Sequence, residues 1–224
     1  MTRVSPTGRA ANRGSQMWFQ RLVENHAALL DQPLLASFGE AAQESIAWKS
    51  PLAPSYKEFR DMAALRALGV TQLTERMDAF WPRRGPVWDG LGITPKGAYV
   101  LVEAKAHIPE LMSGGCKAEG KSLETIRSSL IATRKALAPR SKADWAGPFF
   151  QYANRLAFLR FLRETNQLPV HLAFVYFTND KDMNGPTSEQ AWLGAIRLME
   201  ASLGLGSHRL TPFVHKVFID TRQL

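Results

Sequence analysis

Two residues in the first half of the chain have the types and the spacing that phosphate chemistry requires. Glu103 and Lys105 stand at the end of an apolar run over residues 98–104, which predicts a buried strand. Because side chains alternate along a strand, Glu103 and Lys105 point to the same face, about 6.6 Å apart along it. Burying an acid and a lysine is costly unless they pair or hold a metal, so this strand end is a candidate site.

A predicted hairpin brings a second carboxylate to the same place. Asp89 belongs to a short strand over residues 86–93, and the Thr-Pro-Lys-Gly sequence that follows is typical of a turn, so we expect Asp89 beside Glu103. Two carboxylates and the carbonyl of Ala104 would supply oxygen ligands for Mg²⁺ or Mn²⁺. Such a metal polarises a phosphoryl oxygen and activates a bound water, and Lys105 could orient that water and stabilise the developing charge.

This arrangement resembles the PD-(D/E)XK superfamily, the restriction-endonuclease-like nucleases. Glu103-Ala104-Lys105 stands as its E-x-K and Asp89 as its upstream Asp, although two residues separate Pro86 from Asp89 where the family pattern has them adjacent. The resemblance implies an α/β three-layer sandwich with a central mixed sheet. It also implies Mg²⁺- or Mn²⁺-dependent cleavage of nucleic acid, with DNA as the expected substrate. Asp89, Glu103 and Lys105 would be catalytic, and Asp89, Glu103 and Ala104 would hold the metal.

Members of the superfamily often carry a further carboxylate on the helix before the hairpin. Glu58, Glu75 and Asp78 are all placed in the sequence to supply it. A capping box that starts at Ser55 explains Glu58 equally well, and a solvent-facing position explains Glu75, so the choice stays open. His107 shares the predicted face of the E-x-K residues and could touch a phosphate, or it could cap the strand end as a neutral histidine.

The positive charge of the chain suggests a nucleic-acid surface. The net charge is +8, and basic residues concentrate in the segment after the E-x-K strand. Charge runs are usually solvated faces, but a phosphodiester-cleaving site lies immediately upstream here, so we favour phosphate contact. We expect Lys121, Arg127 and Arg134 from one helix, and Gln151 and Arg155 from one face of the next, to contact nucleic acid. The alternative for Gln151 and Arg155 is a polar surface.

The remaining sequence indicates the elements that would position these residues. A chain of 224 residues fits one domain. The long connection from the hairpin to the next strand must be a crossover, which favours at least one parallel pair. We divide the chain into a flexible basic arm, residues 1–15; an N-terminal helical elaboration, residues 16–54, with helices over 18–30 and 34–48; and the nuclease-like α/β core, residues 55–224, which opens with the capping-box helix.

Other features bound the compartment and the function. No apolar run approaches the ~20 residues that span a bilayer, no apolar region follows the N-terminal arginines, and a single cysteine agrees with a reducing compartment. We therefore expect a cytoplasmic protein without a membrane partner; its oligomeric state stays open, a homodimer included.

Two other functions compete with the nuclease. A non-catalytic nucleic-acid-binding protein that keeps the fold has no need to bury the acid–lysine trio, and a hydrolase of small phosphate esters needs no extended basic segment.

Overall fold

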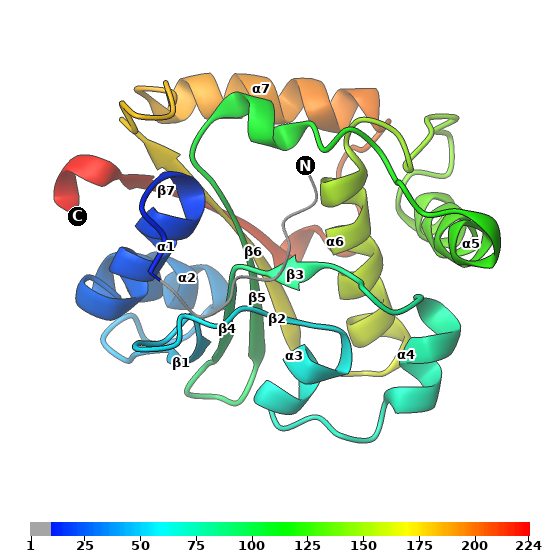
Figure 1. Cartoon of the computed structure of the whole chain (residues 1–224), viewed down its shortest axis with the longest axis horizontal. Coiled ribbons are helices and arrows are strands. Elements are labelled where there is room, and N and C mark those ends of the chain that lie inside the picture. The colour runs from blue at the N-terminus through cyan, green and yellow to red at the C-terminus, as the bar shows by residue number, and fades with distance from the viewer. Residues whose placement is uncertain (1–9) are drawn as a thin grey trace.

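The computed structural model describes residues 10–224, which form an α/β structure around a central mixed sheet of five strands (Figure 1). The α/β class and the mixed sheet are confirmed. Most of the predicted basic arm falls on residues 1–9, outside the described residues. Its expected end at residue 15 is wrong, because the first helix already begins at Gly14.

The central sheet has the strand order β1-β4-β5-β6-β7. The pairs β1–β4 and β4–β5 are antiparallel, and the pairs β5–β6 and β6–β7 are parallel, so the predicted hairpin and the predicted crossover are both confirmed. A separate antiparallel ribbon is formed by β2 and β3. The strands are β1 (Ala47–Ser50), β2 (Phe59–Arg60), β3 (Val87–Trp88), β4 (Gly90–Ile93), β5 (Tyr99–Lys105), β6 (Val170–Thr178) and β7 (Val214–Asp220).

Helices cover both faces of the sheet, an arrangement compatible with the predicted three-layer sandwich (Figure 1). One face packs against α1 (Gly14–Asn25) and α2 (Ala28–Phe38). The core on the opposite face includes residues of α3 (Asp61–Ala67), α4 (Thr74–Phe80), α5 (Gly120–Leu137), α6 (Phe150–Arg160) and α7 (Glu189–Ser202), with α5 on the outer side of α6. Short helical turns complete the described chain: η1 (Ile108–Leu111), η2 (Phe161–Thr165), which extends α6, η3 (Thr211–Phe213) and η4 (Thr221–Gln223).

The alternation of side chains along β5 decides where the candidate site lies. Val100, Val102 and Ala104 belong to the core under α1 and α2, whereas Leu101 belongs to the core under α3–α7. Glu103 and Lys105 have the same parity as Leu101 and therefore face the second layer. Their charged groups are thus enclosed between the sheet and the helices that follow the hairpin.

The helices predicted over 18–30 and 34–48 are wrong in their bounds. The first break comes at residues 26–27, and Pro33 lies inside α2 instead of ending a helix. Helix α2 ends at Phe38 because Gly39 adopts a left-handed conformation with φ +72°, which a glycine accepts without steric cost. The chain then returns as β1, where the indole nitrogen of Trp48 donates to the Asp31 carboxylate at 2.9 Å. Residues 16–54 therefore contribute an edge strand and a whole helical layer.

No helix between residues 10 and 224 has the length and the apolar character needed to cross a membrane.

Candidate active site at the end of strand β5

The β4–β5 hairpin places Asp89 against the E-x-K strand, as predicted. Gly90 pairs with Val102, and the Asp89 amide donates to the Val102 carbonyl at 3.1 Å. One side-chain oxygen of Asp89, Oδ2, accepts the amide of Ala104 at 2.7 Å. Asp89 is only 4 % exposed, so its carboxylate lies inside the protein and beside the backbone between Glu103 and Lys105.

Glu103 lies between two cations. Its Oε1 contacts the ammonium of Lys105, and its Oε2 accepts from the guanidinium of Arg155, with the Nε–Oε2 distance at 2.8 Å. The exposed fractions are 3 % for Glu103, 8 % for Lys105 and 2 % for Arg155. A buried ion is tolerated when charges and hydrogen bonds compensate it, and here both carboxylate oxygens are compensated.

The two cations also set the protonation state of Glu103. Burial by itself would raise the pKa of this carboxyl, but the charges of Arg155 and Lys105 and their hydrogen bonds outweigh that effect and lower the pKa from 4.5 to about 2. Glu103 is consequently an anion throughout the neutral range.

The guanidinium group of Arg155 has several partners. Besides Glu103, it donates to the carbonyl of Val87 at 2.8 Å and to the Asn154 side chain at 2.9 Å, and it lies over the Trp88 ring at 4.6 Å. The alternative of a polar surface is therefore wrong for Arg155, because α6 turns this side chain toward β5. An acid on a buried strand needs cationic partners, and an arginine within the apolar stripe of a helix was the sequence signal for one.

Of the three carboxylates proposed before the hairpin, the structure brings Glu58 to the site. Glu58 is 3 % exposed and accepts the Gln16 side-chain amide at 2.8 Å. In the antiparallel β2–β3 pair Phe59 lies opposite Trp88, so the next position places Glu58 beside Asp89. The predicted capping box is wrong, because α3 begins only at Asp61 and residues 59–60 form β2.

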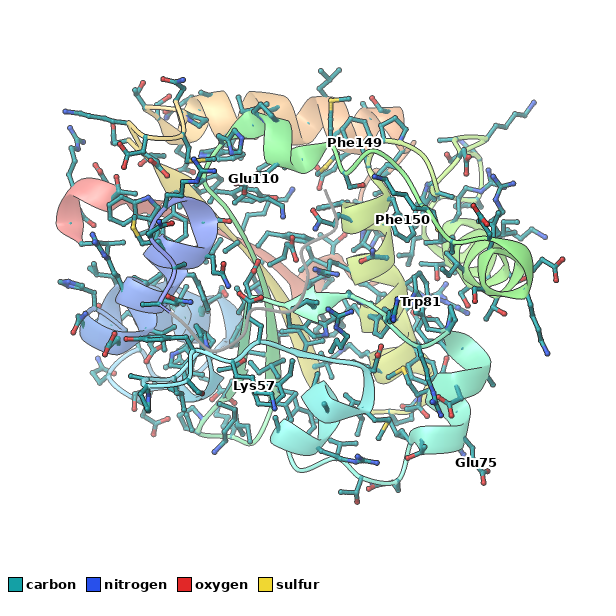
Figure 2. The ribbon with its side chains drawn as sticks, viewed as in Figure 1. Lys57, Glu75, Trp81, Glu110, Phe149 and Phe150 are labelled. Atoms are coloured by element: carbon teal, nitrogen blue, oxygen red, sulfur yellow. The ribbon has the colours of Figure 1, made fainter. Side chains whose placement is uncertain are left out.

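Glu75 and Asp78 are exposed on α4, and Glu75 points away from the protein in Figure 2. Neither lies with the residues at the end of β5. His107 follows the strand and has its Nδ1 2.9 Å from the Glu110 carboxylate. The structure thus places His107 in the turn after β5, where it pairs with an acid.

The groups around Asp89 suit a hard cation by their chemistry. Within a strand, the N–H and C=O groups of one residue point to the same edge. The Ala104 carbonyl therefore points to the side on which its amide meets Asp89. Together with Glu58 this gives a set of oxygen donors of the kind that Mg²⁺ prefers. Over residues 10–224, however, no three His, Cys, Asp or Glu side chains are grouped as metal ligands, and Glu103 is turned toward its two cations.

The predicted nucleic-acid residues on α5 lie apart from this centre. Lys121 and Arg127 are exposed on α5, which packs against the outer side of α6 (Figure 1). Arg134 donates to the Ala143 carbonyl at 2.9 Å and so holds the loop after its own helix. Gln151 is partly buried at the start of α6, and its backbone amide donates to the Ser113 hydroxyl at 3.3 Å. The structure thus does not gather the three α5 residues around Glu103.

Chemically, the site combines carboxylates of the kind that bind a cation with a lysine side chain that pairs with one of them. Comparisons of the chain with family models, with curated proteins and with solved structures found no match. A functional conclusion for this chain therefore depends on its own residues.

Proposed function

We propose that this protein is a metal-dependent phosphodiesterase of the PD-(D/E)XK type that acts on nucleic acid, with DNA as the expected substrate. One observation carries the proposal: the hairpin fixes Asp89 on the Ala104 amide, next to the buried pair of Glu103 and Lys105. Buried ion pairs add little stability compared with well-packed apolar residues, so a site of this kind needs another reason to exist. The mixed sheet with helices on both faces supports a restriction-endonuclease-like fold.

The oxygen donors would hold Mg²⁺ or Mn²⁺. Asp89, the Ala104 carbonyl and Glu58 are suited to it, and Glu103 joins them if it gives up one of its cations. When bound, the metal supplies charge stabilisation at a phosphoryl oxygen and a lower pKa for a bound water.

The chain's own residues supply the rest of the chemistry. Glu103 pairs with the Lys105 ammonium and fixes its position within the site. That ammonium can hydrogen-bond an attacking water and stabilise negative charge as it builds on the phosphate. Arg155 acts as a positioning residue, because it orients Glu103 and thereby Lys105.

A second candidate function is a non-catalytic nucleic-acid-binding protein that retains the nuclease fold. One observation favours it: both oxygens of Glu103 already have cationic partners, which leaves this carboxylate saturated in the described state. The two candidate functions differ in whether the protein binds a divalent metal at Asp89 and whether it cleaves nucleic acid.

The test uses purified protein with Mg²⁺, Mn²⁺ or EDTA on single-stranded and duplex DNA and on RNA. We expect Lys105→Met to lower cleavage by about 10²–10³-fold, because its charge helps only in the transition state, and to leave Mn²⁺ binding intact. Asp89→Asn should lose Mn²⁺ binding in calorimetry. Lys96→Met, at the exposed turn of the same hairpin, serves as the matched control.

Equal cleavage by wild type and Lys105→Met would refute the E-x-K assignment. Undiminished Mn²⁺ binding by Asp89→Asn would refute the metal site. A wild-type protein that binds DNA but neither binds Mn²⁺ nor cleaves would favour the non-catalytic candidate.

A further inference from the structure

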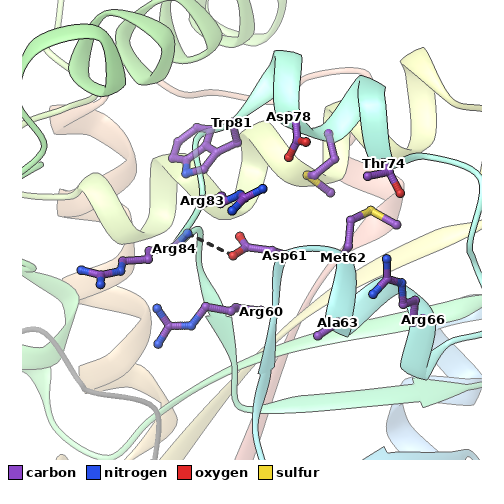
Figure 3. Close-up of a pocket in the computed structure, with 11 residues that line it drawn as sticks. Arg60, Asp61, Met62, Ala63, Arg66, Thr74, Asp78, Trp81, Arg83 and Arg84 are labelled. Carbon is purple, nitrogen blue, oxygen red and sulfur yellow. Dashed lines mark hydrogen bonds between the residues drawn. The ribbon is translucent and has the colours of Figure 1, made fainter.

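A cavity of about 460 Å³ lies between α3, α4 and the segment that leads into β3 (Figure 3). Its lining is rich in one type of charged side chain. We use the name arginine pocket for this cavity and its four arginines, Arg60, Arg66, Arg83 and Arg84. None of the four arginines belongs to the predicted site, although two of them stand in the Arg-Arg-Gly sequence shortly before Asp89.

The four arginines have no compensating partners in the described part of the chain. Over residues 10–224, none of their guanidinium groups makes an ion pair or a hydrogen bond. Elsewhere in the protein, Arg160 and Arg209 pair with Glu164. Four guanidinium groups against two carboxylates in one lining leave an excess of positive charge, which attracts an anion.

The loop that carries two of these arginines is built in a defined conformation. The Asp61 carboxylate accepts the amide of Arg84 at 3.0 Å and that of Gly85 at 2.8 Å. A Cβ on Gly85 would lie 2.5 Å from the Asp61 oxygen, so only glycine fits there. Asp61 and Arg84 both adopt left-handed conformations, with φ 50° and 71°. Such strained residues persist only where surrounding contacts fix them, and they cluster at functional sites.

The carboxylates in the pocket offset only part of its charge, because the lining holds Asp61 and Asp78 against four arginines. Both oxygens of Asp61 accept backbone amides of the arginine loop, and Asp78 belongs to α4 (Figure 3). Arg66, Arg83 and Arg84 are exposed, so an anion can reach them without any opening of the fold.

The pocket is connected to the candidate active site through β3. Arg60 pairs with Val87, and the Val87 carbonyl accepts from Arg155, which holds Glu103. Arg84 lies five positions before Asp89, which at about 3.3 Å per position is a span of at most about 17 Å. The phosphates of one DNA strand follow each other at about 3.4 Å along the helix axis, so a strand of about five nucleotides covers this span.

We propose that the arginine pocket binds backbone phosphates of a nucleic-acid strand that continues beyond the candidate active site. The inference rests on the proposed function for the nature of the ligand, and it deepens that function by making the substrate a polymer. Guanidinium groups suit this task because their donors match phosphate oxygens in pairs. A small phosphate ester at Glu103 could not reach the pocket, whereas a strand can occupy both.

The experiment measures binding without cleavage. A fluorescein-labelled 20-nucleotide single strand is titrated with full-length protein in EDTA at several salt concentrations, and fluorescence anisotropy gives the affinity. The variant Arg83→Gln/Arg84→Gln removes two exposed charges. We expect the variant to bind the strand more weakly. The slope of the logarithm of the binding constant against the logarithm of the salt concentration should be shallower by about 1.4, because two phosphate contacts at about 0.7 each are lost. Circular dichroism should show unchanged folding, because both side chains are exposed.

The matched control is Lys181→Gln/Arg197→Gln, which removes the same charge at exposed positions elsewhere. A pocket variant with the wild-type slope, or with a loss no greater than the control, overturns the inference. A second titration uses adenosine monophosphate as competitor. If adenosine monophosphate competes strongly with the strand and this competition disappears in the pocket variant, the pocket binds small phosphorylated ligands. That result would overturn the inference that it binds a polymer.

These results separate the pocket from the proposed function. If the pocket variant loses strand affinity while wild-type protein cleaves nothing, the pocket inference holds and the nuclease fails. If wild-type protein cleaves and the pocket variant binds and cleaves equally well, the nuclease holds and the pocket inference fails.

Discussion

The buried pair of Arg155 and Glu103 predicts a large loss of stability on removal of the arginine. In Arg155→Met, the carboxylate of Glu103 keeps only Lys105, and the hydrogen bonds to Val87 and Asn154 disappear as well. Removal of one partner of a buried pair costs about 3–5 kcal/mol, because the other charge stays buried without compensation. Methionine retains the apolar volume of the arginine stem, so the effect reports the charge and not a cavity.

For a chain of this length, each kcal/mol lowers the melting temperature by about 2–4 °C, so we expect a fall of about 6–20 °C. Circular dichroism at increasing temperature and urea titration measure it, and the urea midpoint should move without a change in slope. Arg160→Met is the matched control on the same helix. Arg160 is 27 % exposed in its side chain and pairs with Glu164 at 3.2 Å, so its loss should cost about 1 kcal/mol or less.

The double variant Arg155→Met/Glu103→Gln separates pairing from simple packing. Once both charges are removed, no uncompensated carboxylate stays in the interior, so the double variant should be more stable than the sum of the single losses predicts. Additive losses, or a loss in Arg155→Met no larger than that in Arg160→Met, would refute the reasoning.

Two further predictions concern pH and salt. The pKa of Glu103 is lowered from 4.5 to about 2, so its contribution to stability is fully present above about pH 4.5 and is lost as the pH falls toward 2. Urea unfolding should show the stability difference between wild type and Glu103→Gln narrowing by up to about 3 kcal/mol across that window, and a constant difference would contradict it. On α5, Lys121→Ala/Arg127→Ala should reduce the salt slope of duplex DNA binding by about 1.8, at about 0.9 per phosphate. An unaltered slope would mean that both residues belong to a solvated helix face that does not contact phosphates.

The hairpin and the shared face of Glu103 and Lys105 could be predicted because they depend on local alternation and turn chemistry. Edge strand β1 could not, because its pairing with β4 joins segments far apart in the sequence. A helical apolar pattern ran through Gly39, but the left-handed Gly39 ends α2, and the contact of Trp48 with Asp31 shows that the chain turns back there.

The residues around the site show the same limit. The spacing from Ser55 to Glu58 matches a helix cap, but the pairing of β2 with β3 competes with that helix and wins. The inward direction of Arg155 depends on the sheet beneath α6, which no spacing within the helix reveals. Charge partners across layers were therefore the least predictable part of the site.

The position of Val87 between Arg155 and the arginine pocket has a thermodynamic consequence. The Val87 carbonyl is bound by Arg155 on one side of β3, while the other edge of β3 carries Arg60 of the arginine pocket. A ligand that shifts this ribbon also shifts the cation that holds Glu103. Any change that a strand in the pocket causes in the metal affinity of the active site must then be matched by an equal change that the metal causes in strand affinity. Under the proposed function, a favourable coupling of this kind would let a bound strand strengthen metal binding, and a bound metal strengthen strand binding to the same degree.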